Sequence, residues 1–143
     1  MAIIEDLGLS VVINIDGADA VEYDDPEPEP DRKYPDSTVV SKYIESKDDK
    51  EYQINCRVLP QHLWLSEADE RLLSFHAHID GACQARKSVR NYPNTRNHEN
   101  GTVIQGSIIR PTGASSEVLR RFKFSAVTTG TGLRSYDMTY SIY

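Results

Sequence analysis

The sequence has little cysteine and no long apolar run, and each shortage excludes a class of protein. No stretch of the 143 residues approaches the roughly 18 apolar positions that a membrane-spanning helix needs. The first residues carry acids where a signal peptide carries bases, and their apolar run is interrupted. The two cysteines, Cys56 and Cys83, do not make a disulfide framework. We therefore expect an intracellular protein, cytoplasmic or nuclear, with reduced thiols and no membrane contact.

Catalytic signatures are missing as well. The sequence contains no nucleophile elbow, no glycine-rich phosphate loop and no zinc-protease motif. Cys83 follows an Asp-Gly pair, and no partner histidine is indicated for it, so we expect an inert thiol. We expect no enzyme activity, no catalytic residue and no cofactor.

Bases are scarce in the first quarter of the chain. Residues 1–36 hold eleven acids and two bases, a local charge of −9, whereas residues 37–143 hold eleven acids and fourteen bases, a local charge of +3. This split favours internal complementarity or a basic protein partner. It argues against nucleic-acid binding by the protein as a whole, because phosphate contacts need clustered Lys and Arg.

The acidic excess is concentrated in residues 22–36, EYDDPEPEPDRKYPD. Its prolines favour an extended, polyproline-like path. We expect a solvated crossover loop that meets any basic ligand through Glu22, Asp24, Asp25, Glu27 and Glu29. A basic loop of opposite charge follows later in the chain and can face this acidic loop in the same or a neighbouring chain. Its candidate residues are Arg86, Lys87, Arg90 and Arg96.

The dominant hydrophobic period is two, which predicts half-buried strands. The polar residues 46–50 predict a hairpin between two such strands, and Asp80-Gly81 predicts another. Cys56 falls on the apolar face of its strand and is expected to fill core space. The patterns lie over residues 7–16, 39–45, 51–58, 72–81, 82–89, 102–109, 120–127 and 133–143.

About eight short strands with little helix indicate an all-β fold, an antiparallel β-sandwich of jelly-roll type. We expect one domain over residues 1–128, with the acidic crossover loop inside it. A capping-box pattern at 66–69 allows at most one short helical turn near 66–72. Residues 129–143 are expected to be a C-terminal extension that adds an edge strand.

Two histidines, His76 and His78, stand two residues apart in a predicted strand and therefore on one face of it. Metal-binding jelly rolls use this spacing, and imidazole is a common ligand. His62, His98 or Asp80 could complete a site, but no spacing selects among them. Two solvent-facing histidines without a metal remain the alternative.

Six motifs occur in a fixed order along the chain and, taken together, resemble a fungal domain family of unknown function. The resemblance covers about residues 5–128 and implies a fungal source and an all-β domain, with no assigned activity. The strand-like residues 129–143 depart from the polar tail that the family leads us to expect. The motifs are INIDG (13–17), EYDD (22–25), VVSKYIES (39–46), EYQINCRV (51–58), FHAHIDG (75–81) and RRFKFSAV (120–127).

The sequence therefore favours a non-enzymatic protein-interaction or self-association module, with a homodimer formed through an edge strand. Two alternatives stay open. An acidic tract on a β-sandwich suits a nuclear, histone-chaperone-like module. A metal-dependent or small-ligand-binding jelly roll would use His76 and His78.

Overall fold

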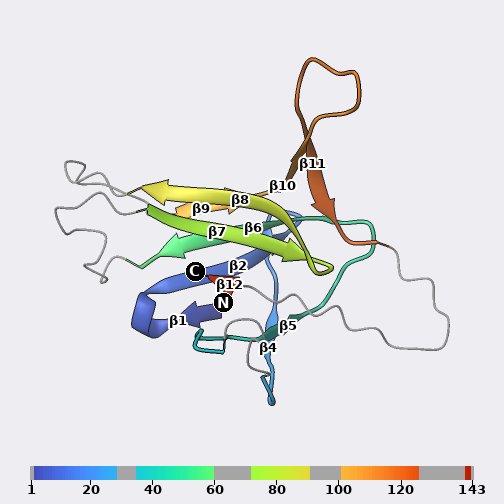
Figure 1. The fold of residues 1–143 in the computed structure, drawn as a ribbon. Coiled ribbons are helices and arrows are strands. Elements are labelled where there is room, and N and C mark those ends of the chain that lie inside the picture. The colour runs from blue at the N-terminus through green and yellow to red at the C-terminus, as the bar shows by residue number, and fades with distance from the viewer. Residues whose placement is uncertain (1, 29–34, 60–71, 91–100, 126–140, 143) are drawn as a thin grey trace.

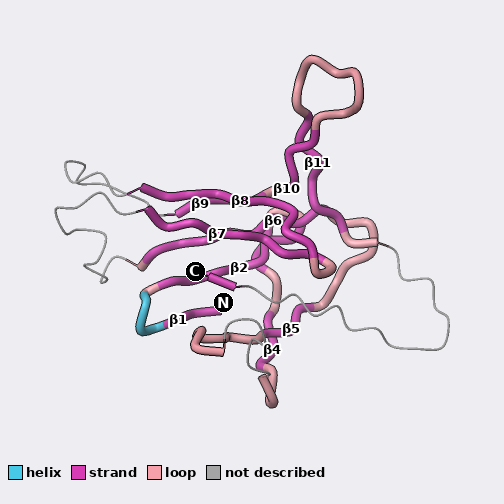
Figure 2. Tube along the Cα trace, in the orientation of Figure 1, coloured by secondary structure: helices cyan, strands magenta, loops and turns pink. Residues whose placement is uncertain are grey.

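The computed structural model describes residues 2–28, 35–59, 72–90, 101–125 and 141–142. These residues form twelve strands, several of them only two or three residues long, and one short 3-10 turn, with no α-helix among them (Figures 1 and 2). Every strand pair is antiparallel, so the predicted all-β, antiparallel fold is confirmed. The helical turn predicted near 66–72 lies outside the described residues except for Leu72, which begins a strand. No helix in these ranges is long and apolar enough to cross a membrane.

The larger of two facing sheets has seven strands and is built around a long pairing of β2 with β6. That pairing runs from Leu9 opposite Val58 to Ile15 opposite Tyr52. Leu7 belongs to the 3-10 turn η1 (Glu5–Leu7), so β2 begins two residues later than the sequence pattern indicated. The strands of this sheet are β1 (Ala2–Ile4), β2 (Leu9–Ile15), β3 (Ala18–Asp19), β6 (Glu51–Val58), β9 (Gly101–Ile104), β10 (Gly106–Ile109) and β11 (Val118–Lys123).

The second sheet is a hairpin of β7 (Leu72–Ile79) and β8 (Ala82–Arg90), with β12 (Ser141–Ile142) on the free side of β7. The predicted Asp80-Gly81 turn is confirmed, and both residues adopt positive φ, 52° and 75°, as such hairpin turns require. Within the expected extension 129–143, Ser141 lies opposite His76, while residues 129–140 and 143 fall outside the described ranges.

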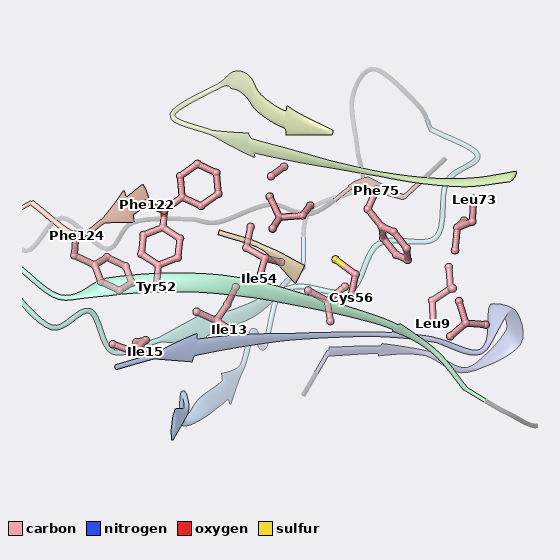
Figure 3. Close-up of a cluster of buried hydrophobic side chains, with 14 residues drawn as sticks. Leu9, Ile13, Ile15, Tyr52, Ile54, Cys56, Leu73, Phe75, Phe122 and Phe124 are labelled. Atoms are coloured by element: carbon pink, nitrogen blue, oxygen red, sulfur yellow. The ribbon is translucent and has the colours of Figure 1, made fainter. Parts of the chain in front are cut away.

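The core lies between the two sheets and is filled from alternate positions of their strands (Figure 3). Tyr52 stacks on two phenylalanines, with ring centroids 5.5 Å from Phe122 and 4.5 Å from Phe124. Cys56 is a free, buried thiol that fills core space as predicted, and burial raises its pKa to about 12. Ser10 and Val12, which alternation places on the polar face of β2, are also buried, because that strand is covered on both faces.

The structure contains a separate two-stranded sheet that contradicts two predictions. β4 (Glu22–Asp24) pairs with β5 (Lys42–Ile44), so the expected acidic loop begins with a strand. The hairpin predicted around residues 46–50 is wrong, because β5 pairs with β4 whereas β6 pairs with β2, β9 and β11. The β4–β5 pairing places Tyr23 opposite Tyr43 and joins Asp24 to Lys42 in an ion pair. Local polar spacing did not reveal this long-range pairing.

A change of pairing partner splits the strand predicted over residues 102–109. β9 pairs with β6, whereas β10, after Gln105, pairs with β11. The close approach of β10 to β11 at this point depends on Gly106, because a Cβ there would lie 2.1 Å from the backbone oxygen of Arg120. The change of partner directs the β10–β11 hairpin away from the two facing sheets (Figure 1).

Candidate functional site

The β10–β11 hairpin, residues 106–123, is called the arm here because it projects past the sheets (Figures 1 and 2). Of β11, only Phe122 and Lys123 pair with β6, so the rest of the arm pairs only with itself. At its far end Arg110 and Glu117 form an ion pair of 3.1 Å, and the turn there contains Gly113 at φ 82°. The arm is therefore a strand pair whose outer half is exposed to solvent.

The arm exposes aliphatic side chains on both of its faces. Ile108 and Leu119 lie opposite each other and are 63% and 46% exposed, and Ile109 and Val118 form the second pair at 40% and 49%. Single exposed apolar side chains are ordinary, but contiguous clusters on a soluble domain mark interaction surfaces. Each face of the arm therefore carries one exposed aliphatic pair.

A groove of about 280 Å³ runs between the arm and β8. One wall is aliphatic and includes Val103, Ile108 and Leu119. The other wall comes from β8 and includes the bases Arg86 and Lys87. An extended segment that carries both apolar groups and acids would complement these two walls.

The described residues of the predicted basic loop form a strand rather than a loop. Arg86 and Lys87 lie within β8, and Arg90 is the last residue of that strand. Arg96 lies outside the described residues. The reason is the Asp80-Gly81 turn, after which the chain returns along β7 for nine residues.

The described acidic candidates lie at the end of the molecule away from the arm, on a segment we call the acidic ribbon, residues 21–27 (Figure 1). Lys42 donates a hydrogen bond to Asp24, which together with its charge lowers the pKa of that carboxyl. Asp25 accepts the backbone N–H of Glu27 at 3.0 Å, and a hydrogen bond from Ser41 is the main cause of its lowered pKa.

The acidic ribbon also carries apolar side chains. Val21 is 66% exposed and Tyr23 55% exposed, and they alternate with Glu22 and Asp24 along the chain. Glu29, the last acidic candidate, lies outside the described residues. The ribbon therefore combines exposed apolar groups with acids, whereas the groove combines exposed apolar groups with bases.

The two histidines lie on the outer face of β7, opposite the core side. Their rings are 6.5 Å apart and nearly parallel, with 5° between the planes. Burial, the charge of Arg86 and the neighbouring His78 together lower the pKa of His76. Arg86 lies opposite His76 in the hairpin register.

Cys83 joins this pair, although no partner histidine was expected for it. Possible ligand atoms of His76, His78 and Cys83 all lie within 4.8 Å of one another. Asp80 is not in the cluster, and His62 and His98 fall outside the described residues. The signal was present, because counting back from a two-residue Asp80-Gly81 turn places Cys83 opposite His78.

Comparison with known proteins identifies the family of the chain but says nothing about these surfaces. No curated protein and no solved structure matches it. A family model described as a domain of unknown function, DUF7918, matches residues 8–137. Because the match covers most of the 143 residues, the chain belongs to this family of domains of unknown function.

Proposed function

We propose that this protein is a non-catalytic interaction module that associates with itself head to tail. In this arrangement the acidic ribbon of one copy occupies the groove between the arm and β8 of the next copy. The observation that carries the proposal is the paired composition of the two surfaces. Apolar groups and bases line the groove, and apolar groups and acids line the ribbon.

The positions of the two surfaces favour a contact between copies over a contact within one chain. The ribbon and the arm lie at opposite ends of the molecule, so a chain does not reach its own groove with its own ribbon (Figure 1). Contacts that use two different patches are heterologous, and they generate rings or open chains rather than simple two-fold dimers. The proposal differs in this respect from the edge-strand homodimer expected from sequence.

The expected affinity is modest. Val21, Tyr23, Ile108 and Leu119 are already partly covered, so each contributes about 1–2 kcal/mol when fully buried. Charges at the rim add specificity and salt dependence more than affinity. After the cost of association, we expect dissociation constants of roughly 10 µM to 1 mM. Asp24 and Asp25 already have bonding partners within the chain, which limits what they add to binding of either a neighbouring copy or a histone-type partner.

Sedimentation velocity over a wide concentration range tests the proposal. We expect mass to rise with concentration at low salt and to fall as salt is added. Ile108→Ser, in the groove, should abolish association, whereas Ile109→Ser, one residue away on the other face of the arm, should not. Tyr23→Ser should abolish association from the ribbon side.

A mixing experiment separates head-to-tail association from any other kind. The Ile108→Ser chain keeps its ribbon, and the Tyr23→Ser chain keeps its groove. Each variant alone should remain monomeric, but an equimolar mixture should form a 1:1 complex that grows no further. Monomers at all concentrations of the unchanged chain, equal effects of the two isoleucine variants, or a mixture without a complex would each refute the arrangement.

A further inference from the structure

We propose that His76, His78 and Cys83 form a binding site for a divalent transition metal of the zinc class. The site lies on the outer face of the β7–β8 hairpin, and Arg86, which is paired with His76, also lines the groove between the arm and β8. It uses two imidazole nitrogens and one thiolate sulfur, which together are unsuited to calcium or magnesium.

The backbone brings these three side chains together for two independent reasons. The strand period of two puts His76 and His78 on the same face of β7. The tight turn at Asp80-Gly81 then pairs Ile79 with Ala82 and His78 with Cys83. Directly opposed residues of an antiparallel pair share a face, so Cys83 joins the histidines on the outside of the sheet.

The distances allow closure onto a metal without moving the strands. The ligand atoms lie within 4.8 Å of one another, whereas tetrahedral zinc with bonds of about 2.0–2.3 Å needs its ligand atoms roughly 3.3–3.7 Å apart. Side-chain rotation makes up the difference. Cys83 is exposed and both histidines are half-buried, so each side chain has room to turn.

Three protein ligands leave the fourth tetrahedral position of a zinc-class ion open. Open sites of this kind take water or an external ligand, whereas closed structural sites use four protein ligands. The cluster in the described residues contains no carboxylate, and Arg86 is paired with His76 in the hairpin register, where its charge acts on the imidazole. A fixed positive charge opposes a divalent cation, so we expect Arg86→Gln to bind metal more tightly than the unchanged chain.

Cobalt titration of the full chain, reduced and metal-free, tests the site directly. Cobalt substitutes for zinc, and a thiolate ligand produces an intense near-ultraviolet charge-transfer band. We expect one equivalent of Co²⁺ to produce this band and Zn²⁺ to displace it. Cys83→Ser should remove the band, and His78→Gln should weaken binding by at least about tenfold. Asp80→Asn is the matched control, because asparagine tolerates positive φ at the turn and should leave binding unchanged.

Thiol labelling provides a second measurement that does not depend on cobalt spectra. Zn²⁺ should slow the modification of the exposed Cys83, while the buried Cys56 stays unreactive with or without metal. His76→Gln should remove this protection. A cobalt band that survives in Cys83→Ser, the absence of any band in the unchanged chain, or labelling that Zn²⁺ does not slow would each overturn the proposal.

Discussion

Replacing Gly106 by alanine tests how the chain leaves the sandwich to form the arm. A Cβ at this position would lie 2.1 Å from the carbonyl oxygen and 2.7 Å from the carbonyl carbon of Arg120, and 2.8 Å from the Cα of Arg121. All three are backbone atoms, so no side chain can move aside. β10 and β11 must separate at their first registered pair, Gly106 opposite Arg121.

This substitution should destabilise the protein because the added methyl group overpacks against a backbone that can shift only partly to accommodate it. We expect a loss of about 1–3 kcal/mol in the free energy of unfolding. With a urea dependence of about 2 kcal/mol per molar, the midpoint should fall by roughly 0.5–1.5 M. Ser107→Ala, the next residue along β10, should change the midpoint far less. An unchanged midpoint in Gly106→Ala would show that the two backbones do not approach as described.

Three further predictions concern the core and its thiols. A thiol reagent should modify one cysteine of the native chain quickly, Cys83, and reach Cys56 only after denaturant is added, whereas two fast equivalents would contradict the burial of Cys56. Burial raises the pKa values of Cys56 and Tyr52 to about 12. The free energy of unfolding should therefore be fully retained below about pH 9 and should decline as the pH rises towards 12. The decline should be at most about 1.4 kcal/mol per pH unit for each group. Urea titrations across this range measure the decline, and a flat profile would count against it. Phe122→Ala should lower the free energy of unfolding by about 3–5 kcal/mol, because it removes a ring stacked on Tyr52 and leaves a cavity, and Phe122→Leu should cost clearly less.

The fold class and several local features could be predicted from the sequence because they depend on short-range patterns. Alternation identified the buried face of β7, with Leu73, Phe75 and Ala77 all buried. The Asp80-Gly81 pair identified the hairpin, because its positive φ angles suit few other residues. Both signals are complete within about ten residues of chain.

The choice of strand partner could not be predicted in the same way. β5 is followed by a polar turn and then by β6, yet it pairs with β4, which lies about twenty residues earlier in the chain. The strand predicted over 102–109 is divided at Gln105 because its two halves bond to different strands. Such pairings depend on contacts between distant segments, and no local pattern encodes them.

The same distinction between local patterns and long-range pairings applies to the candidate surfaces. The spacing of His76 and His78 was visible in the sequence, and a register count from the turn would have added Cys83. The groove was not visible, because Arg86, Val103 and Leu119 come from three separate strands. The strand predicted over 82–89 already contained Arg86 and Lys87, although both were also assigned to a basic loop, and their position in β8 sets them beside the arm.

The register of β8 slips by one residue between its pairings with His78 and Ala77, which leaves Gln84 as an extra residue without a cross-strand partner. Removing Gln84 would keep every other pair of the hairpin, including Cys83 opposite His78 and Arg86 opposite His76. It would, however, straighten β8 and reshape the groove, since Gln84 lines that groove. Deletion of Gln84 would therefore change the groove while keeping the cross-strand pairs that bring His76, His78 and Cys83 together.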